Sequence, residues 1–154
     1  MEKRKQTEVR LMVLLGIVRQ LITTREAKLF AGLELNPSQF GVLNHFTHSP
    51  EQTWTVTSLA KVMEMNQPGI TKIVTVLLDK GLLESRADAA DGRRRYLKIT
   101  AQGLTLCKSI IKSLMPDVSY IFEDWEDVDL TKLEEKMEKL MHWLDTHRDD
   151  IKLC

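Results

Sequence analysis

The hydrophobic pattern along the chain predicts long helices at both ends and a central region in which the period changes. From Glu8 to Leu33, apolar residues recur at helical spacing and occupy most of the helix circumference. A helix that is apolar on nearly every side must be buried on several sides, and one small domain rarely supplies enough partners. We therefore expect a second subunit to cover this N-terminal helix.

Three shorter helices are predicted in the central region, and each has a recognisable first residue. Asn36, directly before a proline, is the expected N-cap of the first of them. Thr55 is the expected N-cap of the second helix, and Asn66 is that of the third. Pro68 lies in the first turn of the third helix, and Gly81 is well suited to end it. A short turn therefore separates the second and third helices.

The third of these helices has two different faces. Its apolar residues, from Ile70 to Leu78, form one stripe at helical spacing. The opposite face carries polar side chains that can hydrogen-bond base edges in the major groove of DNA, and the helix N-terminus can donate backbone N–H groups to a phosphate. The candidate DNA-contacting residues of this helix are Asn66, Gln67, Pro68, Thr71, Lys72 and Thr75.

After this helix the hydrophobic period changes from helical to alternating. Leu82–Arg86 and Arg94–Thr100 are predicted strands around a polar loop, so that they form a hairpin. An arginine at a narrow loop tip can enter the minor groove of DNA, where the negative potential is enhanced. We interpret Asp91 as an acceptor that fixes the direction of Arg93. The candidate residues of the hairpin are Arg86, Asp91, Arg93, Arg94 and Arg95.

Helical spacing returns at Ala101 and continues toward the end of the chain. Pro116 is expected to kink or interrupt the first of these helices. Asp129 is the expected N-cap of the last helix. Between Leu130 and Leu144, apolar residues follow alternating steps of three and four, which is typical of a seam that packs on another helix.

Charge is distributed unevenly along a chain whose formal net charge is zero. The 154 residues are 43% hydrophobic, too apolar for intrinsic disorder, and their net charge alone would argue against a nucleic-acid partner. Residues 1–100, however, carry fifteen Lys and Arg against ten Asp and Glu, whereas residues 101–154 carry seven against twelve. We expect the basic part to face phosphate and the acidic part to face away from it.

The sequence also resembles a known family. Residues 91–103, DGRRRYLKITAQG, resemble the wing signature of the multiple-antibiotic-resistance regulator (MarR) family, in which Asp-x-Arg precedes an alternating strand that ends in Leu-Thr, and then a Gly. Residues 55–60 and 74–86 are similar to the helix-turn-helix of that family. Ile99 replaces the usual Leu. Ser58 stands where the family often has Glu, which is expected to remove the glutamate half of a capping box.

The resemblance covers nearly the whole chain and implies a mainly α winged helix-turn-helix fold with a small β-hairpin wing. It implies dimerisation helices in residues 1–35 and 101–154 and a DNA-binding domain in residues 36–100. As in that family, a homodimer would bind a pseudo-palindromic operator as a transcriptional repressor, with Arg93 inserted into a minor groove. Whether a small-molecule effector releases the DNA is left open. No membrane span or secretion signal is predicted, so the expected location is the cytoplasm.

Two alternative functions stay open. One is a winged-helix module that contacts protein only. The other is a redox- or metal-responsive switch of the same fold, using the pair His45 and His48 or the cysteines Cys107 and Cys154. No third ligand lies close to the His pair in sequence, and Cys107 lies on an apolar stripe that favours a packed thiol. Because no phosphate-binding loop or nucleophile signature is present, we predict neither an enzyme nor a cofactor.

Overall fold

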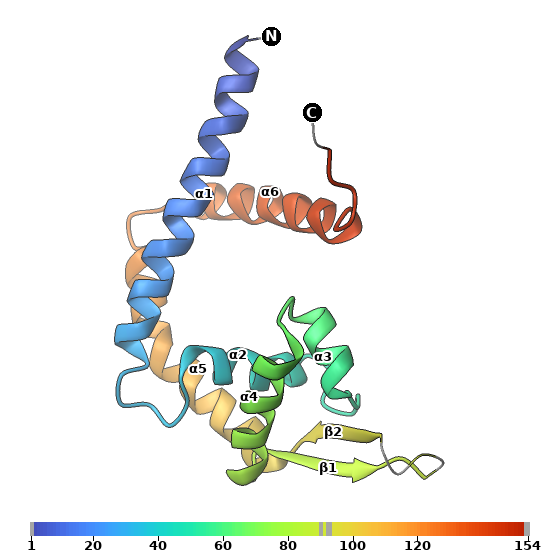
Figure 1. The fold of residues 1–154 in the computed structure, drawn as a ribbon. Coiled ribbons are helices and arrows are strands. Elements are labelled where there is room, and N and C mark those ends of the chain that lie inside the picture. Colours follow the sequence, from blue (N-terminus) through green and yellow to red (C-terminus); the bar gives the residue numbers. More distant parts are fainter. Residues whose placement is uncertain (1, 90, 92–93, 153–154) are drawn as a thin grey trace. The chain divides into compact units, whose positions relative to one another are not determined.

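The fold is mainly helical and carries a two-stranded antiparallel hairpin, as predicted. A computed structural model describes residues 2–89, 91 and 94–152 (Figure 1). The elements in chain order are α1 (Glu2–Leu29), α2 (Pro37–Thr47), α3 (Val56–Val62), α4 (Gln67–Asp79), β1 (Leu83–Ala87), β2 (Arg95–Ile99), α5 (Ala101–Ile121) and α6 (Asp127–Thr146). The chain divides into two compact units, one up to Leu114 and one from Met115 onward. None of the described helices combines the length and hydropathy that a membrane span requires.

The N-terminal helix begins and ends earlier than the hydrophobic pattern predicts. α1 covers Glu2–Leu29, and the chain then leaves the helix through a turn in which Gly32 has a φ of 103°. Phe30 and Leu35 are 7% and 1% exposed, because this turn directs them into the core of the first unit. Packing of these two side chains therefore ends the helix at Leu29, whereas the hydrophobic periodicity alone predicts that it continues to Leu33.

Asparagine side chains start α2 and α4 as predicted. The Asn36 Oδ1 accepts from the backbone N–H of Gln39 at 2.9 Å, and the Gln39 Oε1 accepts from the Asn36 N–H at 3.0 Å, which completes a capping box. The Asn66 Oδ1 accepts from the N–H of Gly69 at 2.8 Å. These bonds satisfy N–H groups that have no partner inside the helix.

The start of α3 corrects one expectation. Thr55 is the N-cap, and its Oγ1 accepts from the Ser58 N–H at 3.1 Å. The Ser58 Oγ in turn accepts from the Thr55 N–H at 2.9 Å, so that the capping box is complete. The prediction that serine removes the second half of the box is therefore wrong, because a hydroxyl close to the backbone can accept the same hydrogen bond as a carboxylate.

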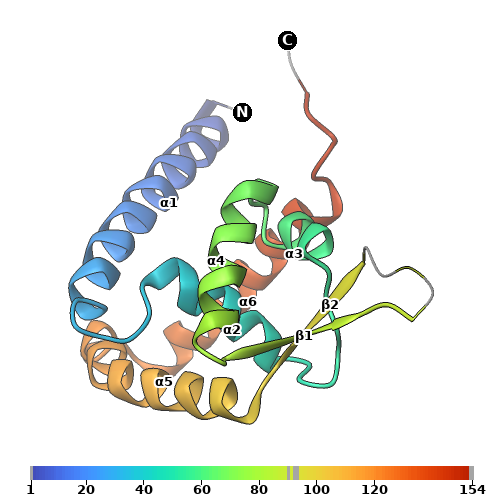
Figure 2. The ribbon, with the colours of Figure 1, turned by 60° about the horizontal axis from the view of Figure 1, so that its bottom comes forward.

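The core of the first unit joins α2, α3, α4 and the hairpin. Fully buried side chains come from each of these elements, and burying one of that size is worth about 1.5–3 kcal/mol. α4 packs against α2, α3 and β1, and it lies at the front of Figure 2 with α2 behind it. The largest fully buried side chains of this core are Phe46, Leu35, Leu43, Leu59, Ile70, Leu77, Leu82 and Leu97.

The connection from α4 to the hairpin is a tight turn at Gly81. This glycine has a φ of 67°, a backbone conformation that residues with a Cβ atom rarely adopt. Its N–H donates to the Leu78 carbonyl at 2.9 Å, and the Leu82 N–H donates to the Leu77 carbonyl at 2.9 Å. These two bonds form a Schellman motif, which confirms Gly81 as the residue that ends the helix.

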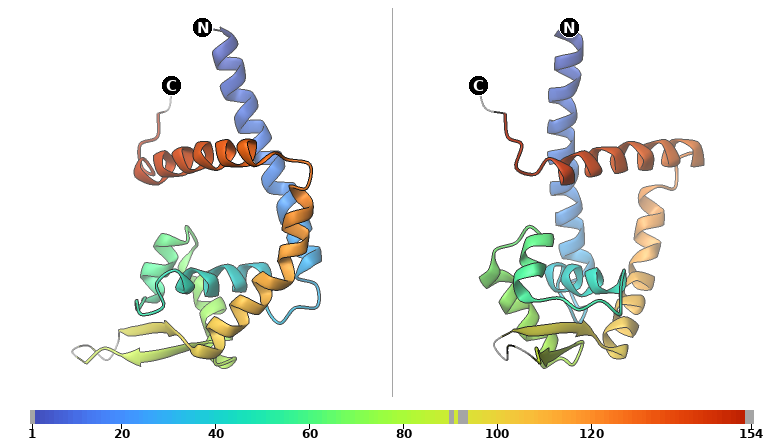
Figure 3. Two further views of the ribbon diagram at one scale, coloured as in Figure 1. Left: turned by 180° about the vertical axis from the view of Figure 1, so that it is seen from behind. Right: turned by 90° about the vertical axis from the view of Figure 1, so that its right-hand side faces the viewer.

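The strands differ from their predicted bounds by one residue: β1 begins and ends one residue later, and β2 is one residue shorter at each end. Leu83 pairs with Ile99 at its base, and Ala87 pairs with Arg95 at the other end. Trp54 extends the pairing beyond two strands, because its N–H donates to the Leu97 carbonyl at 3.0 Å and its carbonyl accepts from the Leu97 N–H at 2.7 Å. The segment before α3 is thereby fixed to β2. Figure 3 shows β1 and β2 extending away from the start of α5.

Residues Thr100 and Gly103 join the hairpin to α5. The Thr100 Oγ1 donates to the Gly81 carbonyl at 2.8 Å and accepts from the Gly103 N–H at 3.0 Å. A Cβ at Gly103 would lie 2.3 Å from the carbonyl oxygen of Leu82. The Thr and the Gly at the end of the wing signature therefore both have structural roles. The Thr100 hydroxyl caps α5, and the absence of a side chain at Gly103 lets α5 approach the turn after α4.

The C-terminal helices differ from the expectations at two residues. α5 is continuous through Pro116, so the helix is not interrupted there, and the alternative expectation of a kink stays a prediction; the boundary between the two units falls just before this proline. The N-cap of α6 is Glu126, without a side-chain cap, and not Asp129. Asp129 and Asp127 instead lie in the first turn, where their charges favour the N-terminal end of the helix dipole.

Candidate nucleic-acid interface

The helix α4 separates buried and exposed residues as the sequence predicts. Ile70 and Leu77 are fully buried and Val74 is 3% exposed, which fixes one face to the core. The opposite face is exposed. The exposed residues on it are Gln67, Pro68, Thr71, Lys72 and Thr75. Five of the six candidate residues of this helix therefore lie together on one accessible surface, and Asn66 caps its N-terminus.

The two threonines of this surface present a defined hydrogen-bonding character. The Thr71 hydroxyl donates to the Gln67 carbonyl at 2.8 Å, and the Thr75 hydroxyl donates to the Thr71 carbonyl at 2.9 Å. Since a hydroxyl has only one proton, both oxygens remain available to a ligand as acceptors only. The γ-methyl groups provide apolar contact beside them.

A residue that the sequence analysis missed lies beside Gln67. The Gln67 Nε2 donates to the Oγ1 of Thr57, an exposed residue of α3, at 3.4 Å. Only the three-dimensional approach of α3 to α4 could have identified Thr57, because it is ten residues away from Gln67 in sequence.

The exposed Lys72 makes no ion pair with any of the residues that the structure describes.

Acidic side chains organise the part of the wing loop that the structure describes. The Arg94 N–H donates to the Asp91 carbonyl at 2.9 Å, and the Arg94 Nε lies 4.0 Å from the Asp91 Oδ2. The Asp91 N–H donates to the Asp88 Oδ1 at 3.2 Å. Arg93 lies outside the described residues, so the contact expected between Asp91 and Arg93 stays a prediction.

The remaining arginines of the hairpin lie on its two opposite faces. Arg86 pairs with Tyr96 across the strands, and its Nη2 lies 3.4 Å from the Glu84 Oε1. Arg95 pairs with Ala87 in the next register position, so its side chain belongs to the other face. Its Nε donates to the Ser85 Oγ at 2.8 Å. The two strand arginines, Arg86 and Arg95, therefore lie on opposite faces of the hairpin.

Comparison with known proteins supports the interpretation of this unit. The model of the MarR family matches residues 33–94, a segment that begins before α2 and reaches the end of the wing loop. The HTH-type transcriptional regulator PetP of Rhodobacter capsulatus is 36% identical over 62 residues, which are 40% of this chain and 37% of PetP. Residues 33–94 therefore form a MarR-family domain, and the match spans little more than a third of PetP, a transcriptional regulator.

Solved structures share the fold over a longer stretch. A MarR family protein from Bacillus stearothermophilus superposes with a TM-score of 0.77 at 19% identity, covering 92% of this chain and 97% of that one. A mutant MarR from E. coli complexed with operator DNA superposes with a TM-score of 0.66 at 20% identity, covering 84% of this chain and 94% of that one. The MarR-type fold therefore includes the long terminal helices as well as the segment that the family model matches.

A pocket of about 270 Å³ lies on one face of the wing. Lys98, on β2, donates to the Glu51 carboxylate at 2.7 Å, and this hydrogen bond lowers the pKa of Glu51. Glu51 precedes the segment that Trp54 fixes to the sheet. The ion pair therefore forms a second link between the wing and the loop before α3, and the distance of 47 residues hides it from sequence reasoning. The pocket is lined by Glu51, Thr53, Glu84, Arg86, Tyr96 and Lys98.

Two of the side chains considered for a metal or redox switch, His45 and Cys107, lie in packed surroundings, whereas His48 is exposed. The His45 ring meets the Trp54 ring edge-on, with centroids 4.7 Å apart, and burial together with the neighbouring His48 lowers the pKa of His45. Within the described residues, no three His, Cys, Asp or Glu side chains are placed to share a metal ion. Cys107 is 1% exposed, and burial raises its pKa to about 11. Cys154 lies outside the described residues.

The burial of Cys107 leads to a measurable expectation. In a Cys154→Ser variant, Cys107 is the single thiol, and we expect it to react with an aromatic disulfide reagent at pH 8 at least about a hundredfold more slowly in the native protein than in urea. The raised pKa keeps the thiol protonated at this pH, and the surrounding core excludes the reagent. Rapid labelling of the native protein with loss of DNA binding would instead support the redox switch.

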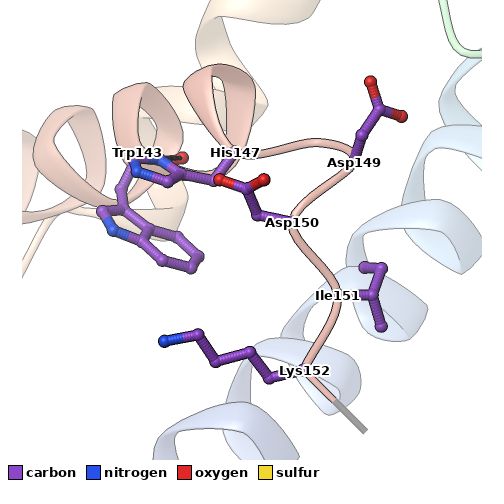
Figure 4. A pocket seen from close by; sticks show the side chains of 6 residues that line it. All are labelled: Trp143, His147, Asp149, Asp150, Ile151 and Lys152. Atoms are coloured by element: carbon purple, nitrogen blue, oxygen red, sulfur yellow. Dashed lines mark hydrogen bonds between the residues drawn. The ribbon is translucent and has the colours of Figure 1, made fainter.

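A second pocket belongs to the C-terminal unit and is acidic (Figure 4). The rings of Trp143 and His147 stack with centroids 4.6 Å apart and an interplanar angle of 9°. The pocket has a volume of about 720 Å³, and Asp149, Asp150, Ile151 and Lys152 complete its lining. Since two carboxylates stand against one ammonium group, this surface is unsuited to the phosphate backbone of DNA.

Proposed function

We propose that this chain is a transcriptional repressor that binds a pseudo-palindromic operator as a homodimer. In this proposal residues 36–100 contact the DNA, with α4 in the major groove and the hairpin arginines at the flanking minor grooves. The observation that carries the proposal is the exposed polar face of α4, anchored from behind by Ile70, Val74 and Leu77. A helix with this division of faces fits the recognition position of a helix-turn-helix.

Exposed apolar side chains on the terminal helices support the dimer. None of the residues of α1 is buried, and Val9, Met12 and Leu21 are 64%, 65% and 64% exposed. On α6, the predicted seam includes Met137 and Leu144, which are 44% and 52% exposed. Large apolar areas on two helices favour cover by another protein surface. We propose that residues 1–35 and 101–154 of a second copy provide it, which would place two α4 helices on the two half-sites of one operator.

The charge distribution predicts how the affinity responds to salt. With a duplex selected from random DNA, we expect log K to fall linearly with log salt concentration, by about a thousandfold or more between about 50 and 200 mM. The physical reason is the release of counterions from the phosphates that basic side chains of residues 1–100 neutralise. Fluorescence anisotropy of a labelled duplex measures this slope.

The same titration separates the proposal from its alternative. Weak binding that does not depend on salt, with no sequence enriched, would contradict DNA recognition and favour a module for protein contacts. A reporter gene placed behind the selected operator then distinguishes repression from activation. An effector that releases the DNA must bind one conformation of the dimer more tightly than the other. The conformation it favours is the one in which the distance between the two DNA-binding units does not fit the operator.

A further inference from the structure

The exposed face of α4 offers an unusual set of groups for reading DNA. Among its exposed side chains are one amide, two hydroxyls and one ammonium group, and this described helix contains no arginine. A bidentate arginine or lysine on guanine is the commonest specific contact in the major groove. Because the hydroxyl protons of Thr71 and Thr75 are donated to helix carbonyls, these residues present oxygens that accept and methyl groups. The face therefore favours contacts other than the arginine–guanine pair.

The hydrogen bond from Gln67 to Thr57 determines which groups of the Gln67 amide are left for a base edge. One of its two Nε2 protons is donated to the Thr57 Oγ1 at 3.4 Å, which leaves one N–H and the Oε1 for a ligand. Adenine presents the matching pair in the major groove, since its N7 accepts and its N6 amino group donates. Among the four bases, only adenine has an acceptor and a donor next to each other on its major-groove edge.

We propose that Gln67 recognises an adenine in each half-site and that Thr57 is its positioning residue. Thr71 and Thr75, one and two turns further along the same face, place their methyl groups against the 5-methyl groups of thymines. The base pairs that Gln67, Thr71 and Thr75 contact in each half-site are therefore A·T pairs in this proposal. This specificity rests on the proposed function, because it requires α4 to lie in the major groove.

Selection of binding sites from random DNA tests the assignment with five proteins. The wild type is expected to enrich adenine at one position of each half-site, and replacing that base pair is expected to weaken binding about tenfold. Gln67→Ala should lose the preference at this position alone, with the salt slope unchanged. Gln67→Glu should move the preference to cytosine, whose N4 amino group donates to a carboxylate. Thr57→Val should relax the same position, whereas Thr57→Ser should retain it.

Each result decides for or against the assignment. A motif that is identical for the wild type and Gln67→Ala, or a guanine required at the position that Gln67 controls, would overturn the assignment while leaving DNA recognition intact. A wild type that enriches no sequence would overturn the proposed function and the assignment together. Thermal unfolding of the variants checks that they are folded, which is expected because Gln67 and Thr57 are both exposed.

Discussion

Replacing Gly103 with alanine is expected to lower the free energy of unfolding by about 3 kcal/mol. The added Cβ would lie 2.3 Å from the Leu82 carbonyl oxygen and 2.9 Å from the Ile99 Cγ1. The first neighbour is backbone held in the Schellman turn after α4, so it cannot move away as the end of a flexible side chain could. α5 would have to shift, which would also lengthen the bond from the Gly103 N–H to Thr100. Urea unfolding followed by circular dichroism measures the loss.

Gly41→Ala is the matched control for this substitution. Gly41 also lies within a helix, α2, but a Cβ there meets no atom within 4 Å. We expect this variant to gain up to about 1 kcal/mol, because alanine favours the helix over glycine. If both variants had the same stability, the close approach of α5 to the turn at Leu82 would be contradicted.

The junction at Gly103 also bears on DNA recognition. Thr100 joins the Gly81 turn at the end of α4 to the start of α5, and β2 ends directly before it. The orientation of α4, the base of the wing and the first turn of α5 therefore depend on one small set of contacts. A shift of α5 would be transmitted through these hydrogen bonds to both elements that are proposed to contact DNA.

Local interactions explain which parts of the fold could be predicted from the sequence. The caps at Asn36 and Asn66 and the turn at Gly81 depend on residues within a few positions of one another, and the structure confirms all three. The end of α1 depends on the burial of Phe30 and Leu35 in a core assembled from distant segments. Helical periodicity contains no information about that core, and the predicted helix therefore continued past the observed end at Leu29.

The candidate site shows the same division between local and distant contacts. The alternation of buried and exposed residues along α4 predicted its polar face, and all the exposed members lie on one surface. The partner of Gln67 is ten residues away on another helix, and Lys98 binds Glu51 from 47 residues away. The sequence alone also does not show that Arg86 and Arg95 lie on opposite faces of the hairpin, because this depends on the strand register.

Replacing Arg93 with alanine is expected to weaken operator binding about tenfold or more. The expectation comes from the wing signature, since Arg93 lies outside the described residues. An arginine in a narrow minor groove interacts with an enhanced negative potential that water-exposed lysines elsewhere on the protein do not experience. The effect should therefore exceed that of one lost charge, and it should be largest for operators whose flanks are A·T-rich. Fluorescence anisotropy with matched duplexes measures both quantities.

Lys139→Ala removes the same single charge from the exposed part of α6 and serves as the control. In the proposed dimer this lysine lies away from the seam between Leu130 and Leu144, as well as outside the DNA-binding domain. We expect its affinity for the operator to stay within about twofold of the wild type, because a distant exposed charge is screened beyond roughly 10 Å at ordinary salt. Equal and small losses in the two variants would show that the wing does not enter the groove, and α4 alone would then carry recognition.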